Sequence, residues 1–219
     1  MLRLKGMHKF DLLNNEQKNI LEKIPHVGQI DGWLFLTEAV KLFELSSKIE
    51  AFRPVICEIG TWKGKSSYIF ASAMKERNGV LYCVDPFNAD GDNASKNDYL
   101  RGMKKLDVSL FKNFEITMNM YGLLQYIKVI PMLSENAHLE FPEQRIDLLF
   151  VDGNHEYESV KKDYELWSPL LPSGGILVLH DIRADHVDGP KRVMQEYVAH
   201  SRYWNNVQIV GEMGIATKI

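Results

Sequence analysis

Short, continuous apolar runs alternate with helical segments along the chain from residue 54 onward. Such runs are typical of strands buried on both faces of a sheet, and their alternation with helices favours parallel strands joined by right-handed crossovers. The expected strands cover 54–60, 80–85, 127–131, 146–152, 176–180, 207–211 and 215–218. The last two are close enough in sequence to form an antiparallel hairpin. The sequence therefore predicts an α/β fold: a Rossmann-like, doubly wound, seven-stranded, mostly parallel sheet with helices on both faces and a C-terminal antiparallel hairpin strand.

The segments between these runs predict the helices. Residues 10–50 carry apolar positions at helical spacing with a glycine-containing break near 28–32, which indicates two helices before the first strand. Further helices are expected at 66–75, 99–121, 134–139, 156–171 and 190–199. A chain of 219 residues is within the range of one large domain. We expect a single domain, 1–219, with an N-terminal helical cap (1–50) and a Rossmann-like core (54–218).

Composition narrows the class of protein. An apolar fraction of 45% predicts a packed core, and a net charge of −3 argues against a basic surface for nucleic acid. Cys57 and Cys83 both lie inside apolar runs, which predicts free core thiols of a reducing compartment. The sequence has no apolar window of membrane-spanning length and no secretory signal at its N-terminus, so we expect a cytoplasmic protein without membrane or nucleic-acid partners.

A glycine-rich turn follows the first expected strand. The strand ends in the acidic Glu58, and the chain runs through Gly60 and Gly64 into a helix. Glycines allow a tight turn and close ligand approach, and a helix N-terminus offers unpaired N–H groups. The four-residue glycine spacing departs from the dinucleotide fingerprint, and Ile59 stands where a phosphate-cradling loop needs glycine. Asp85 closes the second strand, where a carboxylate either accepts hydrogen bonds from a ribose or begins a turn; together with the glycine turn it favours a nucleoside site.

A second group of polar residues follows the fourth and fifth strands. Asp152 and His155 come directly after the fourth strand, and His180 and Asp181 end the fifth. Carboxyl ends of neighbouring parallel strands lie side by side, so these residues should converge at the mouth of the crevice. Two carboxylates there favour a hard divalent cation, magnesium or manganese. The alternative interpretations are that His155 caps the next helix and that Asp181 begins a turn.

The order of these motifs resembles that of class I S-adenosylmethionine-dependent methyltransferases. It reads Glu-x-Gly-x-x-x-Gly, then Asp, then Val-Asp-Gly-x-His, then Gly-Gly-x-Leu-x-x-His-Asp. More narrowly it resembles the small-molecule and sugar O-methyltransferases related to the macrolide-sugar enzymes, over residues 54–218. The resemblance implies that the methionine part of the cofactor lies against the glycine turn, the ribose against an acid, and the adenine beside the residues after the second and third strands. The implied cofactor-binding residues are Glu58, Gly60, Thr61, Gly64, Ser67, Asp85, Phe87, Ser134, Glu135 and Asp152.

The same resemblance implies the chemistry. Asp152, Asp181 and His180 would hold a magnesium or manganese ion, although His180 stands where the family has an acid, and a metal-independent site is the alternative. His155 would act as general base beside Asp152, because imidazole titrates near neutral pH. The expected reaction is O-methylation of a small hydroxylated acceptor, a sugar or glycan or a natural product. A nucleotide-binding Rossmann oxidoreductase using NAD(P) and a non-catalytic cofactor-binding scaffold are the competing functions, and a homo-oligomer is compatible with the sequence.

Overall fold

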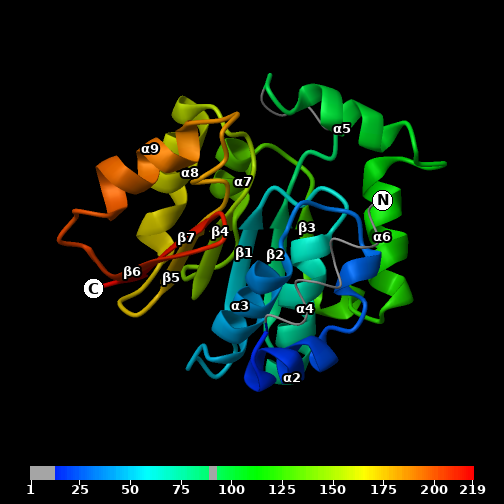
Figure 1. The fold of residues 1–219 in the computed structure, drawn as a ribbon, viewed down its shortest axis with the longest axis horizontal. Helices are drawn as coiled ribbons and strands as arrows, with labels where there is room; N and C mark the ends of the chain where they lie inside the picture. The colour runs from blue at the N-terminus through cyan, green and yellow to red at the C-terminus, as the bar shows by residue number, and fades with distance from the viewer. Residues whose placement is uncertain (1–12, 89–92) are drawn as a thin grey trace.

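The computed structural model describes residues 13–88 and 93–219 and shows one seven-stranded sheet between two layers of helices (Figure 1). The strand order is β3-β2-β1-β4-β5-β7-β6. Only the pairings of β7 with β5 and with β6 are antiparallel among the described strand pairs. The strands are β1 (Val55–Ile59), β2 (Val80–Val84), β3 (Ile127–Ile130), β4 (Leu148–Val151), β5 (Ile176–Leu179), β6 (Trp204–Val210) and β7 (Met213–Lys218). The predicted fold class is confirmed.

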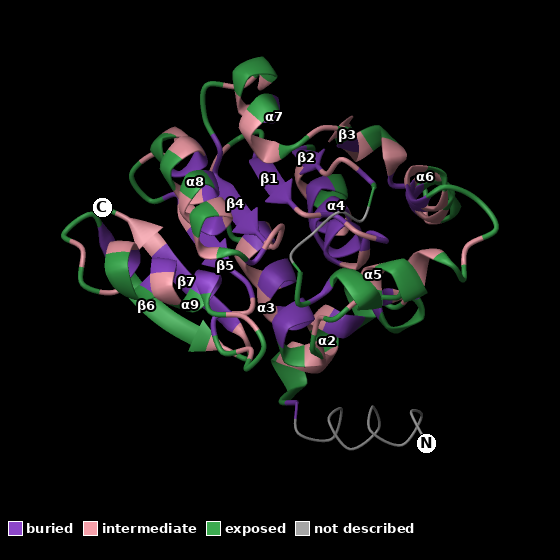
Figure 2. Ribbon diagram, turned by 90° about the horizontal axis from the view of Figure 1, so that it is seen from above, coloured by how far each residue is buried: buried purple, intermediate pink, exposed green. Residues whose placement is uncertain are grey.

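The central strands are buried on both faces because successive side chains point to opposite sides of the sheet. In β1, Ile56 packs into the apolar cluster on one face, whereas Val55, Cys57 and Ile59 pack into the cluster on the other. Figure 2 shows these inner strands in the buried colour and β6, at the edge of the sheet, largely exposed. The two-sided burial explains why the inner strands read as continuous apolar runs.

Helices cover both faces of this sheet. Helices α2, α3, α4 and α6 supply the cluster on one face, and α7, α8, α9 and the π-helical η4 supply the other. The helices are α2 (Asn15–Lys23), α3 (Leu36–Ser47), α4 (Lys65–Arg77), α5 (Lys96–Met103), α6 (Leu110–Met120), α7 (Ser134–Glu140), α8 (Tyr157–Trp167) and α9 (Gly189–Val193). The shorter turns are η1 (Val27–Gln29), η2 (Leu124–Tyr126), η3 (Ser168–Leu170) and η4 (Met194–Val198).

Two elements differ from the sequence prediction. The helix expected at 99–121 is two helices, α5 and α6, because the Ser109 side chain accepts a hydrogen bond from the Lys112 N–H at 3.2 Å and begins a new helix. The strand expected at 207–211 begins earlier, at Trp204, because Trp204 pairs with Lys218 of β7. The residue at which a strand begins to pair with its neighbour is not visible in the apolar periodicity of that strand.

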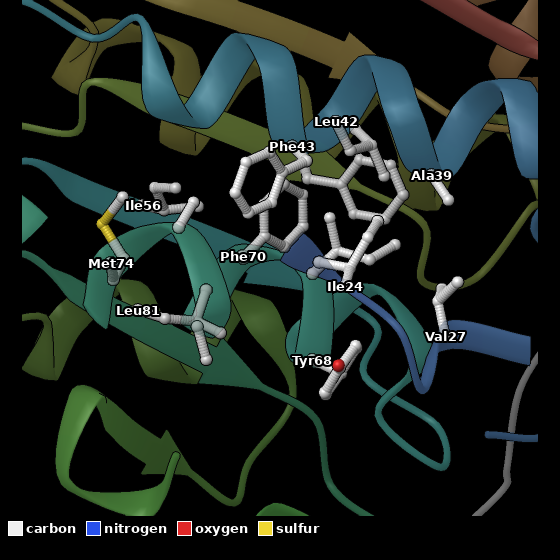
Figure 3. Close-up of a cluster of buried hydrophobic side chains, with 14 of the residues drawn as sticks. Ile24, Val27, Ala39, Leu42, Phe43, Ile56, Tyr68, Phe70, Met74 and Leu81 are labelled. Carbon is white, nitrogen blue, oxygen red and sulfur yellow. The ribbon is translucent and has the colours of Figure 1, made fainter. Parts of the chain in front are cut away.

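The core on the α3–α4 face joins the N-terminal helices to the sheet. Figure 3 shows Leu42 and Phe43 of α3 facing Phe70 of α4, with Ile56 and Leu81 of the sheet nearby. The two phenylalanines and their neighbours are almost entirely shielded from solvent. The N-terminal helices therefore pack on the core, although residues 1–12 of the predicted cap lie outside the described part of the chain and the single-domain assignment stays a prediction.

Two smaller expectations concern the cysteines and the membrane. Cys57 and Cys83 are free and fully buried, as predicted. Within residues 13–88 and 93–219, every helix is too short or too polar to cross a bilayer.

Candidate functional site

A cavity of about 710 Å³ opens over the carboxyl ends of the parallel strands. The chain runs outward from β1 through β2 to β3 and then returns to build β4 and β5 on the other side of β1. Ligands of open α/β sheets bind where the strand order reverses, which here is the crevice between β1 and β4. The cavity is lined there by the residues that follow these strands, including Gly60, Asp85, Asp152 and Asp181.

The turn after β1 requires glycine for two different reasons. Gly60 has a φ of +86°, and a Cβ atom there would lie 2.0 Å from the carbonyl oxygen of Asp152, so the turns after β1 and β4 touch through their backbones. Gly64 has a φ of +90° and packs against Phe114 and Met118 of α6. From this turn and the start of α4, the cavity is lined by Gly60, Thr61, Trp62, Lys65 and Ser66.

Asp85 lies against this turn and holds it closed. Its Oδ2 accepts hydrogen bonds from the backbone N–H groups of Thr61 at 2.7 Å and Trp62 at 2.9 Å, and its Oδ1 accepts one from Phe87 at 2.6 Å. Burial raises the pKa of Asp85, and the three N–H donors oppose that rise. The predicted meeting of this acid with the Gly60–Gly64 bend is thus present, and the carboxylate lines the cavity while it also shapes the loop.

Three of the predicted cofactor residues lie beneath the cavity wall. Glu58 and Ser67 are fully buried, and the Ser67 hydroxyl donates to Glu58 Oε2 at 2.5 Å. Burial raises the pKa of Glu58 to about 8, against the hydrogen bonds from Ser66, Ser67 and Cys83. Phe87 packs against Phe111 and Phe114 in the core. These side chains therefore act on the shape of the turns and do not line the cavity.

The cavity continues toward β3 and α8. Ser134 and Glu135, at the start of α7, line it, and their contact with an adenine stays a prediction. The Ser134 hydroxyl donates to Asp163 of α8, and Lys162 of α8 pairs with Glu135. Burial raises the pKa of Asp163 to about 7, with the Ser134 hydrogen bond opposing it. The sequence analysis did not single out Asp163, because a lone acid in an amphipathic helix reads as a solvated position.

The acidic and histidine residues after β4 and β5 converge as predicted. One ligand atom each of Asp152, His155 and Asp181 lies within 4.8 Å of the other two. His155 is buried, and its Nε2 is 3.5 Å from Asp152 Oδ1 and 3.2 Å from Asp181 Oδ2. Burial alone would raise the pKa of Asp152, but the charges and hydrogen bonds of His180 and His155 lower it to about 2. Two carboxylates and one imidazole form a donor set suited to a divalent cation.

His180 lies directly against two members of that group of three. Its Nδ1 is 3.1 Å from Asp152 Oδ1 and 3.3 Å from Asp181 Oδ1, and its Nε2 is 3.5 Å from Glu38 Oε2, so it lies among three carboxylates at the cavity wall. Burial opposes protonation, but the Asp152 carboxylate and the hydrogen bonds to Asp152, Asp181 and Glu38 raise the pKa of His180 well above its ordinary value. His180 thus contacts both Asp152 and Asp181, and its role as a metal ligand stays a prediction.

Glu38 is a residue that the sequence analysis missed. It is fully buried in α3, and its carboxylate accepts hydrogen bonds from the Phe35 and Glu212 N–H groups, both at 2.7 Å. A Cβ at Gly211 would lie 2.3 Å from its Oε1, so the β6–β7 turn closes directly on it. The sequence does contain a hint of this burial. Glu38 comes directly before the apolar Ala39 and Val40 and falls on the apolar face of the helix.

An aromatic group forms another wall of the same cavity. Trp62 stacks on Trp33 with ring centroids 5.6 Å apart and lies 5.1 Å from Tyr99 of α5. Lys63 donates to Asp31 at 2.7 Å and so ties the segment that carries Trp33 to the glycine turn. This wall combines an N-terminal loop, the turn after β1 and α5, which are distant in sequence.

Comparison with known proteins identifies the family. A family model described as a methyltransferase domain matches residues 57–182, which is more than half of the chain and includes the glycine turn, Asp85, Asp152 and Asp181. The chain belongs to this methyltransferase family. This membership favours a methyltransferase over the oxidoreductase that the sequence left as an alternative.

Curated relatives of this methyltransferase match it over part of their length. An uncharacterized protein of Acanthamoeba polyphaga mimivirus is 26% identical over 57% of this chain and 49% of its own length. An uncharacterized protein of Sinorhizobium fredii is 28% identical over 61% of this chain and 14% of its own length. The methyltransferase thus corresponds to about half of the first relative and a small part of the second.

Solved structures share the fold of the methyltransferase. The O-methyltransferase NovP has a TM-score of 0.65 at 13% identity, over 84% of this chain and 80% of its own. The O-methyltransferase TomG of Streptomyces achromogenes, involved in tomaymycin synthesis and solved with S-adenosylmethionine, has a TM-score of 0.64 at 16% identity, over 97% and 95%. A TDP-rhamnose 3'-O-methyltransferase of calicheamicin biosynthesis has a TM-score of 0.57 at 16% identity, over 83% and 79%. At these identities the likeness shows the fold.

Proposed function

We propose that this methyltransferase transfers a methyl group from S-adenosylmethionine to a hydroxyl of a small molecule, with a sugar or glycan hydroxyl as the first candidate and a phenolic natural product as the second. The observation that carries the proposal is the Asp152–His155–Asp181 group at the edge of a cavity that also contains the glycine turn and Asp85. An oxygen nucleophile must lose a proton to attack the methyl group, and this group places a buried base beside two carboxylates. Fold neighbours named as O-methyltransferases, one of them acting on a TDP-sugar, support the choice of acceptor.

The cofactor would lie along the carboxyl edge of the sheet. Its methionine part would contact the turn of Gly60 and Thr61, its ribose would meet Asp85, and its adenine would lie beside Ser134 and Glu135. All of these residues line one continuous cavity, which supports that arrangement. Glu58, Gly64, Ser67 and Phe87 would contribute by holding the turns in shape.

His155 and the residues around it would remove the proton of the acceptor hydroxyl. Asp152 and Asp181 would hold a magnesium or manganese ion, which when bound lowers the pKa of a coordinated hydroxyl. The same two carboxylates orient the His155 ring, whose Nε2 faces both of them. His155 would accept the proton of the acceptor hydroxyl, and the buried pair of His180 and Glu38 would keep Asp152 in position.

The test is methyl transfer from labelled S-adenosylmethionine to a panel of sugar, nucleotide-sugar and phenolic acceptors, with and without a chelator. We expect transfer to at least one class, loss with chelator, and a loss in kcat of about 10²-fold or more in His155→Ala, the usual contribution of a general base. His200→Ala, which changes an exposed histidine, is the matched control. Wild-type turnover in His155→Ala would refute the base assignment, and cofactor binding without transfer to any acceptor would favour a non-catalytic scaffold.

A further inference from the structure

Asp163 is a buried acid that the proposed transfer chemistry does not use. It lies on α8, is 4% exposed, and lines the cavity beside Gly153, where an added Cβ would be 3.8 Å from its Oδ2. It is on the β3 side of the cavity, with Ser134 and Glu135, whereas Asp152, His155 and Asp181 follow β4 and β5. Asp163 is therefore a buried carboxyl group at the cavity wall, outside the group formed by Asp152, His155 and Asp181.

The fold satisfies this carboxyl group only in part. Among the residues that the structure describes, the Ser134 hydroxyl donates a hydrogen bond to this carboxyl group, and no lysine, arginine or histidine forms an ion pair with it. The charge of Lys162 favours ionisation of Asp163, but Lys162 pairs with Glu135, whose own charge works against that ionisation. A buried carboxylate without a cationic partner lowers the stability of the folded protein. At a cavity wall, a ligand that donates a hydrogen bond to the carboxylate offsets this loss.

The proposed cofactor offers a donor at this end of the cavity. With the ribose at Asp85 and the methyl group near Asp152, the adenine extends toward Ser134, and the exocyclic amino group is the only strong donor on its ring. We propose that Asp163, oriented by the Ser134 hydroxyl, accepts a hydrogen bond from that amino group and selects adenine over purines that carry an oxygen there. The inference rests on the proposed cofactor placement and adds to it a specificity-determining residue.

A comparison of two ligands isolates this contact. S-adenosylhomocysteine and S-inosylhomocysteine differ in the base, where a carbonyl oxygen replaces the amino group and faces a carboxylate unfavourably. By isothermal titration calorimetry at pH 9, where Asp163 with its pKa of about 7 is ionised, we expect the wild-type protein to bind the adenosine compound tighter by about tenfold or more, as a hydrogen bond to a charged group contributes. Asp163→Asn should reduce or reverse that ratio, since its amide can turn its NH₂ group toward the carbonyl oxygen.

Controls separate this contact from general damage. Glu165→Gln makes the same charge change at an exposed position of α8 and should keep the wild-type ratio. Ser134→Ala, which removes only the orienting hydroxyl, should lower the ratio in the same direction and serves if Asp163→Asn does not fold. An unchanged ratio in Asp163→Asn together with tight binding of S-adenosylhomocysteine would overturn the inference alone. Failure of the wild-type protein to bind S-adenosylhomocysteine would overturn the proposed function and this inference with it.

Discussion

Replacing Glu58 with glutamine should remove most of a pH-dependent loss of stability. Glu58 is fully buried at the end of β1; Ser67 donates to its Oε2 at 2.5 Å, and its Oε1 has no partner among the described residues. Glutamine has nearly the same shape, and its amide oxygen can keep the hydrogen bond from Ser67. The change therefore deletes the ionisation with little change in packing.

The magnitude follows from the pKa of the buried acid. Burial raises the pKa of Glu58 from 4.5 to about 8. Each pKa unit corresponds to about 1.36 kcal/mol, so full ionisation of Glu58 in the folded state costs about 5 kcal/mol as an upper figure. The folded state holds the proton more tightly than the unfolded state, so the free energy of unfolding falls as pH rises from 4.5 to about 8 and then levels off.

The assay is urea unfolding of the cofactor-free protein at pH 5 and pH 9. We expect the stability of Glu58→Gln relative to wild type to be more favourable at pH 9 than at pH 5 by about 2–5 kcal/mol. Asp163, whose pKa is raised to about 7, adds a loss of the same sign in both proteins and cancels in the difference. Any fixed penalty from the new NH₂ group cancels in the same way.

Glu22→Gln, an exposed position of α2, is the matched control and should show no such difference. If the stability gap between wild type and Glu58→Gln is equal at the two pH values, Glu58 does not carry a raised pKa. The electrostatic account of the turn after β1 would then be wrong.

Two further substitutions test the turn and the core. Gly60→Ala would place a Cβ 2.0 Å from the Asp152 carbonyl oxygen. We expect a loss of S-adenosylhomocysteine affinity of about tenfold or more by calorimetry, since backbone strain of this kind costs on the order of 1–3 kcal/mol. Gly28→Ala, where nothing described lies within 4 Å, should bind normally, and equal affinities would contradict the backbone contact. Phe70→Ala should lower the free energy of unfolding by about 3–5 kcal/mol in urea, because Phe70 is fully buried between α4 and the sheet. Phe52→Ala, at 98% exposed, should change it by less than about 0.5 kcal/mol, and similar losses in both would contradict the core assignment.

Local patterns account for most of what the sequence predicted correctly. The inner strands are buried on both faces, so they appear as uninterrupted apolar runs, and the turn after β1 appears as two glycines because its backbone needs φ values of +86° and +90°. The convergence of Asp152, His155 and Asp181 followed from parallel topology alone, since neighbouring strands end at one edge.

Tertiary packing decided which side chains face the cavity. Glu58 and Ser67 belong to the predicted motif, yet they point into the interior and bond to each other. Asp163 lines the cavity because α8 packs beside α7, where the Ser134 hydroxyl donates to it. Spacing along the chain gives the element and its end, but the side of a turn on which a side chain lies depends on what packs against it.

The contact between His180 and Glu38, next to Asp152, separates what the sequence determined from what packing decided. The sequence by itself determined the sheet, the glycine turn and the position of each acid at a strand end, because these depend on residues close together in the chain. Only the tertiary structure decided that Glu38, from the helix before the first strand, lies 3.5 Å from His180 at the end of the fifth. The physical reason is that burial of α3 against the sheet brings these residues together, and no local periodicity records a contact made by packing.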